Sequence, residues 1–138
     1  MTMTLDFPIQ PAVPPTALRL LAEAERGLVE AGHEPNPAHR FAMAYLCALR
    51  AAAAMLALRG RPHRARSRPT SVWTLLASVA PELREWAAFF ASGSATRASV
   101  QAGITRVVSP RTADDLVRQA EQFTALVRRA VNGTAGTR

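Results

Sequence analysis

An arginine-rich stretch from Arg59 to Pro69 concentrates the side chains of this chain that could do chemistry. It reads Arg-Gly-Arg-Pro-His-Arg-Ala-Arg-Ser-Arg-Pro. Guanidinium groups bind phosphate through two parallel hydrogen bonds, a geometry that the ammonium group of lysine cannot reproduce. The stretch therefore predicts a phosphate-binding surface whose candidate nucleic-acid-binding residues are Arg59, Arg61, His63, Arg64, Arg66 and Arg68.

A solvated turn in an arginine-biased protein would explain the same stretch without any ligand. All 17 basic residues of the chain are arginine, as coding in a GC-rich genome would also produce. The net charge of +7 nevertheless favours acidic partners such as nucleic acid. No aromatic residue interrupts the arginines, so binding there would be mainly electrostatic and poorly sequence-specific.

Other residues with chemical potential form weaker patterns. His33, Glu34 and His39 lie close together in the chain, but two histidines and a carboxylate in a loop do not make a typical metal site. Asp114 and Asp115 suit the positive N-terminal end of a helix. We therefore assign no catalytic residue and expect neither a metal nor a cofactor.

The single cysteine, Cys47, excludes an internal disulfide and favours the reducing cytoplasm. Residues 1–10 do not show the basic region and apolar run of a secretory signal. The longest apolar stretch, Phe41 to Leu58, is rich in alanine and carries Arg50 near its centre. Because a central arginine disfavours membrane insertion, we expect this alanine-rich stretch to form a buried helix and not a membrane span.

Two amphipathic patterns open the chain. A first helix is predicted from Pro15 to Gly32, with a stripe formed by Leu18, Leu21, Ala24, Leu28 and Val29. Asn36-Pro37 then predicts the start of a second helix that runs to Arg59 and stops at Gly60. This second helix is apolar on both faces, so it is either central in the fold or shared with a second protein.

The second half of the chain repeats these signals. Thr70 or Ser71 can cap a third helix, which Pro81 should kink or split before it ends at Gly93. Its stripe contains Val79, Leu83, Trp86 and Phe90. Trp73 and Trp86 are expected in the core, with partial exposure of Trp73 left open because it follows the arginine-rich stretch.

A short helix from Ala95 to Gln101 and a last long helix complete the prediction. The last helix should begin at Ser109-Pro110 and end at Asn132-Gly133, with Asp114 pairing with Arg118 four residues later. Its apolar stripe is Ala113, Leu116, Ala120, Phe123, Val127 and Ala130.

These elements predict an all-α fold, an antiparallel bundle of four main helices with one kinked or split helix and a short extra helix. We divide the chain into a flexible N-terminal arm (1–14), the bundle (15–132) and a flexible tail (133–138).

Several segments resemble an actinobacterial branch of the HEPN superfamily, over roughly residues 16–131. They are Arg40-Phe41-Ala42 with Ala44 to Ala54, Ser71-Val72-Trp73 through Ala80-Pro81-Glu82-Leu83, Glu85 to Phe90, Arg106-Val107-Val108, Ala113 to Arg118, and Glu121-Gln122-Phe123. The resemblance implies a helical bundle, usually paired into a homodimer. Members include metal-independent ribonucleases, RNA or nucleotide binders, and partners of nucleotidyltransferases.

The ribonucleases of that superfamily carry Arg, four to six residues and then His near the start of the last long helix. Here Arg106 precedes that helix, but Arg111, Thr112 and Ala113 occupy the positions where His is required, and no histidine follows His63. The catalytic site is therefore not carried over. The spacing of Arg26 and His33 matches by chance, at the end of the first helix.

Three functions remain open. The first is a non-catalytic bundle that binds RNA, other nucleic acid or a nucleotide through the arginine-rich stretch. The second is a homodimeric adaptor, built on the second helix, that serves a protein partner such as a nucleotidyltransferase or an antitoxin partner. The third, less favoured, is a metal-independent ribonuclease with unusual acid–base groups.

Overall fold

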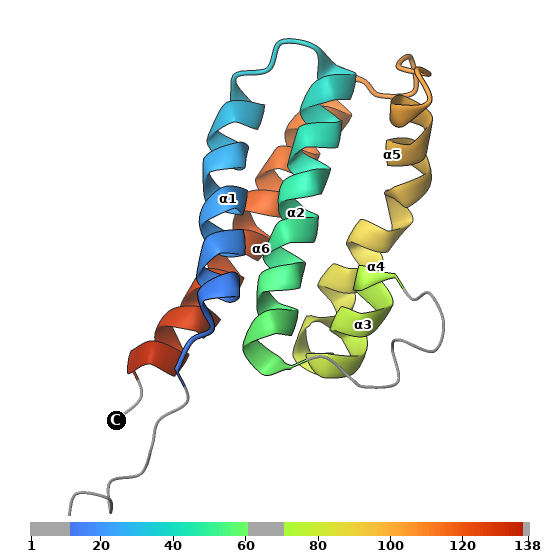
Figure 1. The fold of residues 1–138 in the computed structure, drawn as a ribbon. Helices are drawn as coiled ribbons and strands as arrows, with labels where there is room; N and C mark the ends of the chain where they lie inside the picture. Colours follow the sequence, from blue (N-terminus) through green and yellow to red (C-terminus); the bar gives the residue numbers. More distant parts are fainter. Residues whose placement is uncertain (1–11, 61–70, 137–138) are drawn as a thin grey trace, which may run out of the picture.

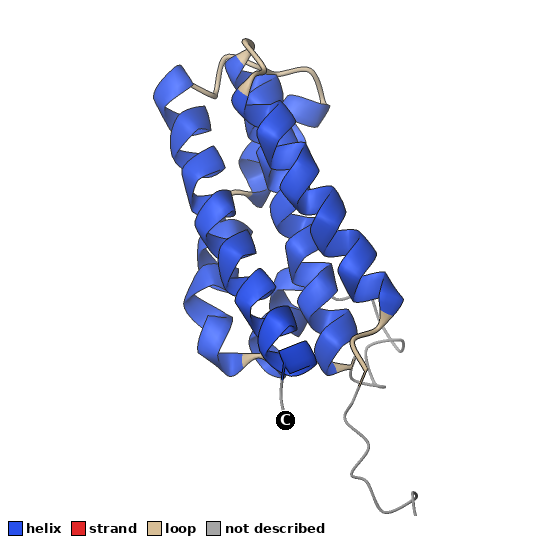
Figure 2. Ribbon diagram, turned by 90° about the vertical axis from the view of Figure 1, so that its left-hand side faces the viewer, coloured by secondary structure: helices blue, strands red, loops and turns tan. Residues whose placement is uncertain are grey.

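The computed structural model describes residues 12–60 and 71–136. The helices in these two ranges are α1 (Pro15–Gly32), α2 (Pro37–Arg59), α3 (Val72–Val79), α4 (Arg84–Ser92), α5 (Ser94–Gln101) and α6 (Pro110–Gly136). A 3₁₀ turn, Pro81–Leu83, joins α3 to α4. Within these ranges there is no strand (Figure 2), and the predicted all-α bundle with a split third helix and a short extra helix is confirmed.

Local capping rules place most helix ends where the sequence predicts them. Asn36 accepts a hydrogen bond from the backbone N–H of His39 (3.1 Å), and Ser71 accepts one from Thr74 (3.1 Å). Ser109 caps α6 in the same way, through the N–H of Thr112 at 3.0 Å. These side chains satisfy backbone donors that a first helical turn leaves free.

Helix α2 lies at the centre of the bundle. It packs against α1 and α6 along its length and contacts α3 and α5 on another side (Figure 1). Alanines from both of its predicted faces are buried, among them Ala44, Ala48 and Ala54. The prediction that α2 is central in the fold is therefore confirmed, whereas a partner on its second face, where Leu46 is 37% exposed, stays a prediction.

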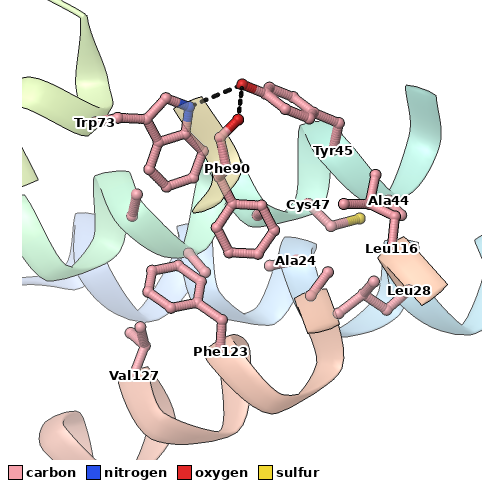
Figure 3. Close-up of a cluster of buried hydrophobic side chains, with 14 of the residues drawn as sticks. Ala24, Leu28, Ala44, Tyr45, Cys47, Trp73, Phe90, Leu116, Phe123 and Val127 are labelled. Carbon is pink, nitrogen blue, oxygen red and sulfur yellow. Dashed lines mark hydrogen bonds between the residues drawn. The ribbon is translucent and has the colours of Figure 1, made fainter. Parts of the chain in front are cut away.

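An aromatic cluster fills the space between α2, α3, α4 and α6 (Figure 3). The Trp73 ring stacks on Phe90 at 5.0 Å, and Phe123 packs against Phe90 at 5.3 Å between centroids. The indole N–H of Trp73 donates to the Tyr45 hydroxyl (2.9 Å), which in turn donates to the carbonyl of Phe90 (2.8 Å). Burial raises the pKa of Tyr45, so this phenol stays protonated and keeps its donor role.

Three predictions, about a helix face, a helix end and an ion pair, were wrong. Leu18 and Val29 are 43% and 64% exposed because α1 buries the stripe of Ala17, Leu21, Ala24, Leu28 and Ala31, whose small members face the core. Helix α6 continues past Asn132-Gly133 to Gly136, since Val131 is buried and Thr134 donates to the carbonyl of Ala130.

The third concerns a predicted ion pair. Asp114 does not pair with Arg118. It accepts from Arg40 at 2.7 Å instead, while Arg118 pairs with Asp115 three residues earlier. The pair of Arg40 and Asp114 forms because the carbonyls of Glu34 and Pro35 hold the Arg40 guanidinium in place.

Candidate functional site

The arginine-rich stretch begins at Arg59, the last residue of α2. Gly60 closes that helix with a positive φ of 88°, and its N–H donates to the carbonyl of Leu56 at 2.8 Å. A left-handed residue turns the chain sharply away from the helix axis, and glycine adopts it without steric cost. Of the candidate residues, Arg59 is described, whereas Arg61, His63, Arg64, Arg66 and Arg68 lie outside the described residues.

Arg59 is already engaged in an ion pair. Its guanidinium donates to the carboxylate of Glu82, in the 3₁₀ turn after α3, at 2.5 Å. This contact lowers the pKa of Glu82 and raises that of Arg59. Both side chains are solvent-exposed, so the pair is a weak restraint and a phosphate could replace Glu82.

The first turn of α6 holds acidic and basic groups but has no histidine. Arg106 and Arg111 are exposed, and neither forms an ion pair in the described part of the chain. The backbone N–H of Thr112 donates to the capping side chain of Ser109, and Ala113 is fully buried. The position at which the HEPN ribonucleases carry their histidine is thus occupied here by Arg111, Thr112 and Ala113.

Arg40 is a residue whose importance sequence reasoning missed. It donates to the carbonyls of Glu34 (2.9 Å) and Pro35 (3.1 Å) as well as to Asp114. It therefore fastens the loop between α1 and α2 to the start of α6. No local pattern could reveal this role, because its acidic partner lies 74 residues away in the chain.

The histidine pair does not assemble a metal site. The ring of His33 donates to the carbonyl of Val29, and Glu34 accepts from the N–H of Asn36. No group of three or more His, Cys, Asp or Glu side chains that could hold a metal occurs in residues 12–60 and 71–136.

The remaining candidates are structural. Cys47 is 2% exposed, and burial raises the pKa of its thiol to about 11, so the thiol stays protonated at neutral pH. Trp73 is buried, so the partial exposure that its place after the arginine-rich stretch left open is not observed. Trp86, which was expected in the core, is partly exposed.

A cleft that the sequence did not predict opens beside the start of α6. It has a volume of about 260 Å³, and its walls come from α2, α4, α5 and α6. Phe41 and Phe90 lie at its buried side, whereas Phe89 is 43% exposed and Asp115 stands at its rim. The one sequence signal for this cleft was Phe89, an aromatic residue that lies outside the apolar stripe of its helix.

By length and composition, α2 could cross a membrane, and it is the one helix among the described residues of which this is true. Of its most apolar window, however, 56% is buried inside the bundle. The core helix of a soluble protein has the same character, which agrees with the interpretation of this stretch as a buried helix.

Comparison with known proteins agrees with the fold. No curated protein and no solved structure matches the chain significantly. The model of the SAV_6107-like HEPN family matches residues 31–128, which is well over half of the chain and runs from the end of α1 into the last turns of α6. The chain therefore belongs to the SAV_6107-like HEPN family.

Proposed function

We propose that this protein is a non-catalytic HEPN-domain protein that acts as a homodimer in the cytoplasm and binds RNA or other nucleic acid through the segment Arg59–Arg68. The observation that carries the proposal is the density of guanidinium groups in that segment. The absence of any histidine after His63 argues against the family's ribonuclease chemistry.

The position of the segment supports the proposal. It begins at Arg59, on the end of the central helix α2, and Gly60 ends that helix. Glu82 is the acidic side chain that contacts it among the residues described, and that exposed contact is easily exchanged for a phosphate. The remaining arginines follow one another closely enough to meet consecutive phosphates.

The test is fluorescence anisotropy of a labelled single-stranded RNA titrated with the full chain at several salt concentrations. If about four phosphates are neutralised, log affinity should fall with log salt with a slope of roughly −3. Between 50 and 200 mM salt, that slope corresponds to an affinity loss of roughly 50-fold. A variant with Arg61, Arg64, Arg66 and Arg68 changed to Ser should lose both the affinity and the slope.

A matched control separates the segment from net charge. Changing Arg26, Arg84, Arg106 and Arg111 to Ser removes the same charge from exposed positions that form no ion pair in residues 12–60 and 71–136. Equal losses in the two variants would contradict a specific role for the segment. A gel of the RNA after titration should show intact strands, and no binding at low salt would favour the protein-adaptor alternative instead.

A further inference from the structure

Three neighbouring hollows lie along α4 and α6, and we call them together the groove. The cleft at the start of α6 is followed by two shallower hollows, and neighbouring hollows share Phe89 and then Trp86. Helices α4 and α6 meet mainly through large side chains, such as Trp86 against Phe123 at 5.7 Å between centroids. These rings hold the two helices apart and leave the groove open.

The floor of the groove is apolar and unusually exposed. Phe89 is 43% exposed, Trp86 and Leu126 are partly exposed, and all three line hollows of the groove. Aromatic side chains contribute most to protein interfaces when they stand at the centre of a polar rim. Here Glu85 and Gln119 provide polar side chains beside Phe89 and Trp86.

The residues that α6 contributes follow a seven-residue spacing. Asp115, Gln122 and Arg129 line the groove and are seven apart, as are Gln119 and Leu126. A face that repeats every seven residues stays aligned with another helix that packs along it at a shallow angle. The groove can thus receive a helix that packs along residues 115–129 of α6.

We propose that a second copy of this chain occupies the groove, with the two α6 helices antiparallel and the twofold axis at Gln122. In that register Asp115 of each copy faces Arg129 of the other, and Gln122 meets its own equivalent, whose amide can both donate and accept. The opposite charges at the two ends of one face make the face complementary to itself. This rests on the homodimer of the proposed function and replaces α2 by α4 and α6 as its interface.

The charges at the ends of the groove are available for such contacts. Arg129 is exposed and forms no ion pair in the residues described. Asp115 pairs with Arg118 within the chain, but both side chains are at least half exposed. Such a pair contributes little, so Asp115 can exchange or share its partner when Arg129 of the second copy arrives.

Sedimentation equilibrium of the full chain without RNA tests the interface. The wild type should be a dimer, and Phe89→Glu should weaken it by at least about tenfold, because a charge would replace an exposed aromatic ring that lines the groove. Exposed Leu18, on the far helix α1, gives the control Leu18→Glu, which should remain dimeric. A monomeric wild type at all concentrations would overturn the proposal.

Charge reversal tests the antiparallel register. Asp115→Arg and Arg129→Asp should each weaken the homodimer, on the order of tenfold, because each places like charges opposite one another twice. An equimolar mixture of the two variants should dimerise again, as should the double variant. A dimer that ignores these changes while circular dichroism shows folded protein would refute the register.

The outcome is distinguishable from failure of the nucleic-acid proposal. The variant lacking Arg61, Arg64, Arg66 and Arg68 should keep its dimer mass even though it loses RNA. Conversely, Phe89→Glu leaves the arginine-rich segment intact, so a loss of dimer mass with residual salt-dependent RNA binding would separate the two properties. If only mixing with another protein covers the groove while the chain alone stays monomeric, the second-copy proposal is wrong.

Discussion

Two halves of the bundle achieve burial in opposite ways. Between α1 and α2, the buried residues are mostly small, and the helices approach so closely that a Cβ atom on Gly27 would lie 2.5 Å from Sγ of Cys47. Between α2, α3, α4 and α6, five aromatic rings fill a wider space. We call the first region the small-residue seam (Ala24, Gly27, Ala31, Ala44, Cys47 and Ala51) and the second the aromatic cluster (Tyr45, Trp73, Trp86, Phe90 and Phe123).

The difference predicts opposite sensitivities to side-chain volume. Close helices joined by alanine and glycine have no room for added atoms, so the small-residue seam should be harmed by enlargement. A cluster of interlocking rings loses many contacts when one ring is removed, so the aromatic cluster should be harmed by truncation. The same wider spacing of α4 and α6 also leaves the groove exposed, which connects this half of the core with the proposed interface.

Phe123→Ala should produce the largest effect. The ring is fully buried and contacts Trp73, Trp86 and Phe90, so its loss leaves a cavity among stiff neighbours that cannot collapse around it. We expect the free energy of unfolding to fall by about 3–5 kcal/mol, measured by urea denaturation.

The matched control is Phe89→Ala, which removes an identical ring from a half-exposed site next to the same cluster. At protein concentrations low enough for the chain to be monomeric, its cost should be less than half that of Phe123→Ala, because much of the ring then contacts water. Equal costs would mean that the aromatic cluster extends to the surface and that its boundary, as defined above, is wrong.

Gly27→Ala should be the next largest change. The new methyl group overlaps Sγ of Cys47, and the expected strain of about 1–3 kcal/mol exceeds the gain of up to about 1 kcal/mol that alanine brings to a helix. Urea denaturation should therefore show a net loss of roughly 1 kcal/mol.

Two further variants test the reason for that loss. In Gly32→Ala the same methyl group meets nothing within 4 Å, so no loss is expected. Adding Cys47→Ala to Gly27→Ala removes the overlapping sulfur and should recover stability, giving a coupling energy between the two sites. Simple additivity of the two changes would show that α1 and α2 can move apart at little cost.

The ends of the helices were readable from sequence because their causes are local. The Asn36-Pro37 and Ser109-Pro110 pairs fix the starts of α2 and α6 through contacts three residues away. Pro81 splits the third helix because its ring and missing N–H prevent continuous helix there.

The orientation of helix faces was less accessible because it depends on the neighbours. Leu18 and Val29 fit an apolar stripe, yet α1 turns its small residues toward α2 and leaves both exposed. Hydropathy ranks leucine above alanine, whereas close packing of two helices reverses that order. The contact between Arg40 and Asp114 depends likewise on the assembled bundle.

The candidate site likewise has one part that the sequence could locate and one part that only the packing reveals. Composition locates the arginine-rich segment, and its function stays a prediction for all residues beyond Arg59 and Gly60. The groove on α4 and α6 needed the structure, because Phe89, Gln122 and Arg129 look unremarkable until the packing of Trp86 and Phe123 shows which face stays open.

Thr124→Val should give the smallest effect, and with the opposite sign. Thr124 is 3% exposed, and its hydroxyl oxygen has no hydrogen-bond partner among the residues described. Valine keeps the branched shape and removes a polar group whose burial is unfavourable, so the free energy of unfolding should rise by about 0.5–1 kcal/mol. Because the shape is retained, the seam and the cluster are left as they are, and the change isolates polarity from volume. Thr134→Val is the control, since that hydroxyl donates to the carbonyl of Ala130 and its removal should bring no gain. If urea denaturation shows instead that Thr124→Val lowers stability, a buried water satisfies the hydroxyl. Polar contacts would then distinguish the small-residue seam from the aromatic cluster in addition to side-chain volume.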